Sequence, residues 1–207
     1  MTEPITVLLV EDHLTVRKGL ELVLRDEGFR VAGVTDSVEE AYRMFTARRP
    51  DVAVLDVRLG GESGADLAER ILATDPDAGL LIYTGVSDRE TIERVAACGT
   101  RGFALKTGGP QELVRAIRAV AAGGVYVDPD LAALLAPRVS AGSRLTDRER
   151  EVFDLLATGM TGEQVAEQLV VSPETVRTHV RNGMRKLDAR TRTHAVAIAV
   201  RLREISL

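Results

Sequence analysis

The sequence predicts a doubly wound α/β domain with a five-stranded parallel sheet, followed by a smaller all-α domain of four helices. Short apolar segments alternate with stretches of helical spacing through residues 1–122, whereas only helical spacing remains over 143–207. Residues 123–142 contain glycines, prolines and serines, which predicts a linker. Strict alternation of strands and helices is typical of a parallel sheet with right-handed crossovers.

The five predicted strands are short and almost continuously apolar, as expected of parallel strands that helices cover on both faces. They span Thr6–Val10, Val31–Val34, Val52–Leu55, Leu80–Tyr83 and Gly102–Leu105. Between them, the spacings Ser37–Glu40 and Ser87–Glu90 fit capping boxes, which mark the starts of helices.

Capping signals also mark the starts of helices in the second domain. Thr146–Glu149 and Thr161–Gln164 have capping-box spacing, and the pair Ser172-Pro173 places proline at a first helical position. A fourth helix is predicted from about Thr193 to Arg203, and Leu131–Leu135 predicts a short helix in the linker.

The composition is that of an ordinary globular protein, with 45% hydrophobic and 28% charged residues. No apolar run is long enough to span a membrane, and the acidic start leads directly into a strand instead of a signal peptide. The single cysteine, Cys98, excludes an internal disulfide and a Cys-rich zinc site. We therefore expect a cytoplasmic protein with no membrane partner.

The charge is distributed unevenly along the chain. Residues 1–122 have a net charge of −5, whereas 143–207 have +2 and the segment from Ser172 onward has +5. This asymmetry predicts an acidic domain joined to one that meets a polyanion, although chance scatter of surface charge is an alternative.

Polar residues follow four of the predicted strands at their carboxyl ends, where open α/β sheets bind ligands. They are Glu11 and Asp12 after the first strand, Asp56 after the third, Thr84 after the fourth and Lys106 after the fifth. Converging carboxylates repel one another unless a cation neutralises them, and oxygen ligands suit Mg²⁺. A phosphoryl group on Asp56 would then be matched by Mg²⁺, Lys106 and Thr84. The alternative is that polar residues simply end these strands.

Helices predicted over 161–169 and 173–187 are joined by a three-residue turn, as in a helix-turn-helix. On the second of them, three apolar residues recur at core spacing, while Arg177, Thr178, Arg181 and Arg185 lie on other faces. These side chains could enter a major groove, or they could form an ordinary solvated face.

Residues 5–122 resemble the receiver domain of bacterial two-component response regulators. The motifs that carry the resemblance are VLLVEDH, VAVLDVRLGGESG, LLIYTG and RGFALK. The resemblance implies a flavodoxin-like fold and the following roles: Asp56 as phosphoacceptor; Glu11, Asp12, Asp56 and the backbone carbonyl of Arg58 as metal ligands; Thr84 as switch hydroxyl; Lys106 as partner of the phosphoryl group; and Phe103 as switch aromatic. Phe103 could equally be a plain core aromatic. The loop Arg58–Gly61 lacks the family's usual proline, which predicts a looser loop.

Residues 143–205 resemble the four-helix DNA-binding domain of the NarL/FixJ, or LuxR-type, regulators, most specifically in TVRTHV followed by KL. The resemblance implies that Arg177, Thr178 and Arg181 reach base edges and that Thr175, His179, Lys186 and Arg190 contact phosphates. His179 could equally be a half-buried surface histidine. The last helix, with Ala195, Val196 and Ala199, resembles the family's dimerisation helix.

Gly183 stands where the family usually carries Ile or Leu. A glycine inside a helix costs about 1 kcal/mol relative to alanine. We hypothesise that the recognition helix is therefore less stable than its relatives' until DNA or a partner orders it, and that Gly183→Ile raises the melting temperature.

These features predict a DNA-binding transcriptional regulator controlled by phosphorylation of Asp56. The implied partners are a histidine kinase as phosphodonor, double-stranded DNA, a second copy of the chain in the active state, and RNA polymerase as a further candidate. The chain is not expected to be an enzyme apart from catalysing its own phosphorylation and dephosphorylation. Two alternatives stay open: a phosphorylation-independent regulator with a vestigial receiver, and a small phosphatase with Asp56 as nucleophile. Arg58 stands where a second acid could protonate a leaving group, which argues against the phosphatase.

Overall fold

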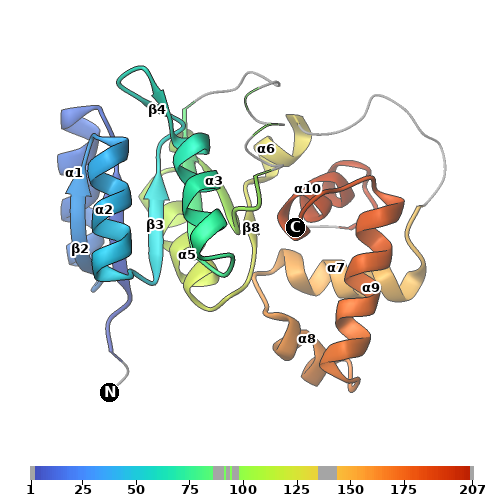
Figure 1. The fold of residues 1–207 in the computed structure, drawn as a ribbon. Coiled ribbons are helices and arrows are strands. Elements are labelled where there is room, and N and C mark those ends of the chain that lie inside the picture. Colours follow the sequence, from blue (N-terminus) through green and yellow to red (C-terminus); the bar gives the residue numbers. More distant parts are fainter. Residues whose placement is uncertain (1–2, 86–90, 92–93, 95–97, 135–143, 206–207) are drawn as a thin grey trace.

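The computed structural model describes residues 3–85, 91, 94, 98–134 and 144–205. Figure 1 shows a sheet covered by helices beside a group of helices, with the junction between them formed by α6, β8 and α10. This confirms the predicted fold class. None of the described helices is long and apolar enough to cross a membrane.

The main sheet has six parallel strands in the order β2-β1-β3-β6-β7-β8. They are β1 (Thr6–Val10), β2 (Arg30–Thr35), β3 (Val52–Leu55), β6 (Leu80–Thr84), β7 (Gly102–Leu105) and β8 (Tyr126–Val127). The five predicted strands are confirmed to within one residue at each end. The sixth, β8, lies in the segment 123–142 that was predicted as a linker, and it pairs with β7 through Gly102↔Tyr126 and Phe103↔Val127.

Helices cover both faces of the sheet. The helices α1 (Leu14–Asp26) and α5 (Pro110–Ala121) cover one face, and α2 (Val38–Arg48) and α3 (Gly64–Thr74) cover the other. Alternate strand residues point to opposite faces, so that Val7 and Leu9 belong to one apolar cluster while Leu8 and Val10 belong to the other.

The predicted N-terminal cap of α2 is confirmed only in part. The Ser37 hydroxyl accepts the Glu40 amide at 3.3 Å. The Glu40 carboxylate accepts the Thr35 hydroxyl at 2.6 Å and so takes a different partner from the one a capping box requires. The second predicted box, Ser87–Glu90, lies outside the described residues.

The segment after β3 forms a small hairpin between β4 (Arg58–Leu59) and β5 (Glu62–Ser63). Its turn residues Gly60 and Gly61 have φ values of +58° and +100°, as a type I′ turn requires. This turn chemistry allows a tight hairpin without a proline, and the expectation of a looser loop stays a prediction.

The helical domain contains α7 (Asp147–Ala157), α8 (Gly162–Gln168), α9 (Pro173–Lys186) and α10 (Arg192–Arg201). Reciprocal capping boxes begin α7 and α8, as predicted. Ser172 caps α9 by accepting the Thr175 amide at 3.1 Å. The turn before α9 contains Val170, which is 90% exposed and has φ +53°.

The two parts share one continuous apolar core. The short helix α6 (Pro129–Leu134) and β8 both contact α10, and the buried cluster that includes Val127 and Leu131 continues to Val196 and Ala199. A buried hydrogen bond joins the Thr193 hydroxyl of α10 to the Thr100 carbonyl oxygen, at 2.8 Å. The last helix is consequently enclosed between the sheet edge and the rest of its own domain.

Gly183 is buried within α9 because the side chain of Phe153 occupies the space beside it. A Cβ at this position would overlap the Phe153 ring and lie 3.3 Å from a methyl carbon of Leu145. The structure argues against the expectation that Gly183→Ile raises the melting temperature, because Phe153 of α7 already fills the space that the isoleucine would need.

Gly183→Ile is accordingly expected to lower stability. Overpacking a filled core costs about 1–3 kcal/mol, which exceeds the gain in helix propensity. We expect a lower midpoint in thermal or urea unfolding. Gly19→Ala in α1 serves as a control, because nothing lies within 4 Å of an added Cβ there. A melting temperature for Gly183→Ile equal to or above that of the wild type would contradict this account of the packing.

Candidate functional site

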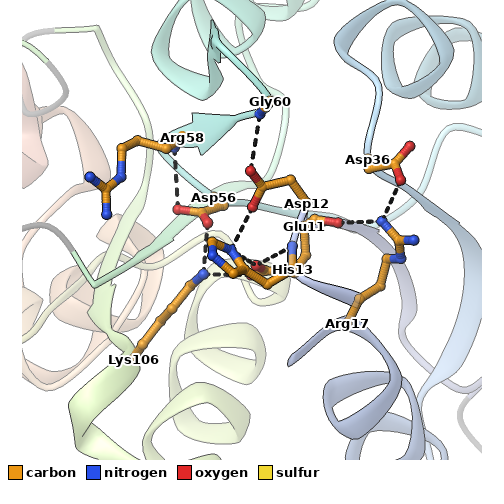
Figure 2. A network of polar contacts seen from close by, with 9 residues as sticks. All are labelled: Glu11, Asp12, His13, Arg17, Asp36, Asp56, Arg58, Gly60 and Lys106. Carbon is orange, nitrogen blue, oxygen red and sulfur yellow. Dashed lines mark hydrogen bonds and ion pairs between the residues drawn. The ribbon is translucent and has the colours of Figure 1, made fainter. Parts of the chain in front are cut away.

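The carboxyl edge of the sheet gathers the acidic and basic residues that follow its strands (Figure 2). Glu11 and Asp12 follow β1, Asp56 follows β3 and Lys106 follows β7. The Asp56 amide donates to the Val10 carbonyl oxygen at 2.9 Å, which fixes the ends of the two neighbouring strands against each other. The predicted convergence of these side chains is therefore present in the structure.

Lys106 bridges the two most buried carboxylates. Its Nζ lies 2.7 Å from Asp56 Oδ2 and 2.6 Å from Glu11 Oε2. Asp56 is 5% exposed and Glu11 is 1% exposed. Burial by itself lowers the pKa of Lys106, but the hydrogen bonds and negative charges of Asp56 and Glu11 outweigh burial and raise this pKa above its usual value. The site thus holds a permanent ammonium beside the candidate phosphoacceptor.

The two oxygens of Asp12 have different surroundings. Oδ2 accepts the Gly60 amide of the hairpin at 3.0 Å. Burial raises the pKa of the Asp12 carboxyl, but this hydrogen bond, the contact with the His13 ring and the positive charge of Lys106 outweigh burial and hold the pKa below its usual value. Oδ1 is buried and accepts no hydrogen bond from the described residues. Its nearest described polar neighbour is His13 Nδ1, at 2.7 Å. A buried, ionised carboxylate oxygen is a group that a cation would stabilise.

The donor set suits a divalent cation. Glu11, Asp12, His13 and Asp56 each offer one ligand atom, and these four atoms lie within 4.8 Å of one another. Asp56 also accepts the Arg58 amide at 3.3 Å, so the first residues of the hairpin lie next to the acidic cluster. The residues present therefore fit a metal ion bound largely through oxygen.

The two predicted switch residues are both buried. Thr84 ends β6 and is 3% exposed, and β6 lies next to β3 in the sheet, which places Thr84 at the same edge as Asp56. Phe103 is 3% exposed and belongs to the apolar cluster that continues into α6 and α10. In this state Phe103 is thus a core aromatic.

Two residues at the site, His13 and Arg17, were not predicted from the sequence. His13 places Nδ1 2.7 Å from Asp12 Oδ1, and Arg17 donates to the Glu11 carbonyl oxygen at 2.8 Å while pairing with Asp36 at 2.7 Å. The sequence carried a signal for His13, since it directly follows the two acids. The sequence carried no signal for Arg17, because its partners Glu11 and Asp36 follow two different strands, β1 and β2.

The outer face of α9 presents the predicted DNA-contacting residues. Arg177 and Arg181 are exposed, and Arg177 pairs with Glu174 at 2.9 Å in solvent. The Thr178 hydroxyl donates to the Glu174 carbonyl oxygen, and the Thr175 hydroxyl lies 2.8 Å from that of Ser172. His179 is half-buried and Arg190 is exposed. Of these side chains, those of Arg177, Arg181 and Arg190 are exposed, whereas those of Thr175, Thr178 and His179 are partly buried.

Lys186 has a different partner from the predicted phosphate. Its Nζ lies 2.6 Å from Oε2 of Glu149, which is buried in the capping box of α7. Burial alone would raise the pKa of Glu149. The hydrogen bonds from Lys186 and Thr146 outweigh burial and hold this pKa below its usual value. Lys186 therefore neutralises a buried acid and joins α9 to α7, which argues against a contact with DNA.

Comparison with protein families matches both halves of the chain. Residues 7–118 match the response regulator receiver domain, and residues 143–199 match the bacterial regulatory proteins of the luxR family. The first match alone covers more than half of the chain.

Similar proteins of known function span nearly the whole chain. The DNA-binding transcriptional activator DevR/DosR of Mycobacterium tuberculosis is 36% identical over 96% of this chain and 95% of its own length. A nitrate/nitrite response regulator protein homolog of Haemophilus influenzae is 34% identical over 96% of this chain and 97% of its own length.

Solved structures share the arrangement of domains. The response regulator ChrA of a heme-sensing two-component system superimposes with a TM-score of 0.56 at 28% identity, over 98% of this chain and 99% of that one. A structure of two RcsB dimers bound to DNA superimposes with a TM-score of 0.60 at 21% identity, over 97% of this chain and 100% of that one, and supports the fold alone. The chain therefore belongs to the two-component response regulators that join a receiver domain to a LuxR-type DNA-binding domain and regulate transcription.

Proposed function

We propose that a histidine kinase phosphorylates this chain on Asp56 in the cytoplasm, and that the phosphoryl group controls dimerisation and sequence-specific DNA binding. The observation that carries the proposal is the contact of Lys106 Nζ with the buried carboxylates of Asp56 and Glu11. It combines a carboxylate nucleophile and a fixed positive charge at the edge where such sheets bind ligands.

The proposed reaction transfers a phosphoryl group from the kinase to this chain. A carboxylate oxygen of Asp56 attacks phosphorus, and a new O–P bond forms as the P–N bond to the kinase imidazole breaks. The Lys106 ammonium pairs with the transferred oxygens, and the Thr84 hydroxyl binds another of them. The same groups would support later hydrolysis of the acyl phosphate, which is the extent of catalysis that we propose for this chain.

The proposed metal ion is Mg²⁺. Glu11, Asp12, Asp56 and the backbone carbonyl of Arg58 would hold it, and the convergence of the three carboxylates within 4.8 Å supports this assignment. Such an ion neutralises the charge that gathers when a phosphoryl group approaches several carboxylates.

A continuous set of contacts leads from this site to the second domain. Asp128 is buried, and its carboxylate accepts the Leu105 amide at 3.3 Å and the Asp130 amide at 2.9 Å. Its own amide donates to the Phe103 carbonyl oxygen at 2.8 Å. One side chain thus joins the end of β7, next to Lys106, to the start of α6. A movement of Lys106 would reach α10 by this route, because α6 packs on α10.

The burial of helix α10 supports control of dimerisation by phosphorylation. Ala195, Val196 and Ala199, the residues expected to dimerise, are all buried against α6, the sheet edge and the helical domain. Arg177 and Arg181 on α9 remain exposed. We infer that this form of the chain withholds the dimerisation surface while leaving the base-reading helix accessible. Phosphorylation would release α10 and favour a dimer on two half-sites.

Arg177 is expected to contribute to sequence recognition. Arginine bonds bidentately to guanine in the major groove, and one such contact is worth about 1–3 kcal/mol of discrimination. Arg177→Ala should therefore weaken binding to the operator, found by selection from random DNA, by about tenfold or more. Its binding to random DNA should change much less.

The measurement compares operator and random duplexes at one salt concentration, with and without acetyl phosphate. Equal losses on both duplexes would reassign Arg177 to a phosphate contact. Lys186→Ala is a useful contrast, because we expect it to lower the stability of the domain by breaking its pair with buried Glu149. Wild-type binding that ignores the phosphodonor would instead support a regulator with a vestigial receiver.

The remaining partners of the proposal are proteins. A second copy of the chain would pair through α10, and the sensor kinase would reach the exposed edge that carries Asp56. One relative is named a transcriptional activator, which makes a contact with RNA polymerase part of this proposal.

A further inference from the structure

We propose that His13 is a further metal ligand, and that its imidazole biases the site towards Mn²⁺ relative to Mg²⁺. The inference rests on the proposed binding of a divalent ion by Asp12 and Asp56. It adds a residue and an ion preference to that site.

The imidazole of His13 lies where a ligand to the same ion would lie. Nδ1 is 2.7 Å from Asp12 Oδ1 and 3.4 Å from Glu11 Oε1, and the four candidate ligand atoms, including one of Asp56, fall within 4.8 Å of one another. In an octahedral site with metal–ligand distances of about 2.1 Å, neighbouring ligands are about 3 Å apart and opposite ones about 4.2 Å. The observed separations are close to these values.

His13 Nδ1 and Asp12 Oδ1 are in direct contact at 2.7 Å. The carboxylate oxygen is buried and accepts no hydrogen bond from the other described residues. A neutral imidazole at this distance from the carboxylate oxygen can share one ion with it, since both atoms belong to the group of four that lies within 4.8 Å. The backbone holds His13 in this place, because its amide donates to Glu11 Oε1 at 3.1 Å and the residue is the N-cap of α1.

The His13 side chain is not committed to capping the helix. It makes no capping hydrogen bond to α1 and is 65% exposed. A change at this position should therefore leave the fold intact.

A metal ion at this position does not compete directly with Lys106. Lys106 contacts Oε2 of Glu11 and Oδ2 of Asp56, whereas His13 faces Oε1 of Glu11 and Oδ1 of Asp12. Glu11 thus presents one oxygen to the ammonium and the other to the side on which His13 lies, whereas Asp12 contacts His13 and Asp56 contacts Lys106. An ion on the His13 side would meet both negative charge and a nitrogen donor.

A nitrogen donor changes which ion such a site prefers. Mg²⁺ binds oxygen ligands and keeps several waters, whereas imidazole is a common ligand of first-row transition ions. The expected preference for Mn²⁺ is modest, since Mn²⁺ is the weakest binder of that series. We expect His13 to contribute about tenfold to the ratio of Mn²⁺ to Mg²⁺ affinity.

The test is Mn²⁺ binding to the full chain, followed by electron paramagnetic resonance, with Mg²⁺ as competitor. In the wild type, pulsed spectra should show coupling to the nitrogen of a bound imidazole. Displacing Mn²⁺ from the wild type should also need more Mg²⁺ than displacing it from His13→Ala. In His13→Ala the nitrogen coupling should disappear and the affinity ratio should fall about tenfold. His194→Ala is the matched histidine control and should retain both properties.

Two results would overturn the inference: wild-type spectra without nitrogen coupling, or an affinity ratio unchanged in His13→Ala. Asp12→Asn separates this failure from failure of the proposed site. If Asp12→Asn abolishes Mn²⁺ binding while His13→Ala has no effect, only the role of His13 is wrong. If neither change affects Mn²⁺ binding, the ion lies elsewhere and the proposed metal site is also wrong.

Discussion

Asp56→Asn is expected to take up no phosphoryl group from acetyl phosphate with Mg²⁺, whereas the wild-type chain is expected to be labelled at a single residue. The amide keeps the size of the side chain but removes the carboxylate oxygen that would form the O–P bond. It also removes the charge that Lys106 now neutralises at 2.7 Å. The effect should be all or none in a labelling experiment read by intact mass.

Asp36→Asn provides the matched control for this experiment. Asp36 follows β2 at the same edge of the sheet, but its carboxylate is exposed and pairs with Arg17, away from Lys106. It should be labelled like the wild type. Label on Asp56→Asn at the wild-type level would show that another residue is the acceptor.

The second large effect, on DNA binding, is expected from a change at the seam between the two domains, where Gly124 contacts Gly159. Gly124 packs directly on the backbone of Gly159, and a Cβ at Gly124 would overlap the Gly159 carbonyl oxygen. Gly124→Ala should therefore push the domains apart and expose α10 without a phosphoryl group. Couplings between sites are typically worth 5- to 150-fold, so we expect the unphosphorylated variant to bind operator DNA roughly tenfold more tightly than the wild type.

Gly19→Ala is the control for Gly124→Ala, since an added Cβ there meets nothing within 4 Å. It should bind DNA as the wild type does. Operator binding by unphosphorylated Gly124→Ala no tighter than that of the wild type would mean that the seam does not restrain α10. Intact melting transitions for both variants would exclude misfolding as the cause of any difference.

Local sequence signals were sufficient to predict most of the fold. The parallel strands are buried on both faces, so their apolar runs mark them to within one residue at each end. Capping residues marked the starts of α7, α8 and α9 because each satisfies an amide that the helix leaves unpaired. The site at the sheet edge was predicted from the polar residues that follow the strands, since the carboxyl ends of parallel strands lie at one edge of the sheet.

Tertiary contacts decided the features that the sequence did not indicate. The strand β8 has only two residues and follows two glycines, so no periodicity marks it, and pairing with β7 creates it. The glycine at 183 predicted a less stable recognition helix, yet Phe153 from another helix packs against it. Lys186 looked like a surface cation because its partner, Glu149, lies 37 residues away.

The apolar residues of α10 illustrate the same limit. Five consecutive residues, from Ala195 to Ala199, are buried, which is more than a helix with one apolar face would bury. The sequence suggested a surface for a second copy of the chain. The structure shows that α6 and β8 cover this helix within one chain. One apolar surface would thus serve the closed monomer and the dimer in turn.

Sedimentation velocity before and after phosphorylation tests this exchange most directly. The unphosphorylated chain should sediment as a monomer of 22.4 kDa, because α10 is enclosed. After acetyl phosphate and Mg²⁺ it should sediment as a dimer of about twice that mass, and Asp56→Asn should stay monomeric under the same conditions. A wild-type chain whose sedimentation is the same in both states, although labelling of Asp56 is complete, would contradict control of α10 by the receiver.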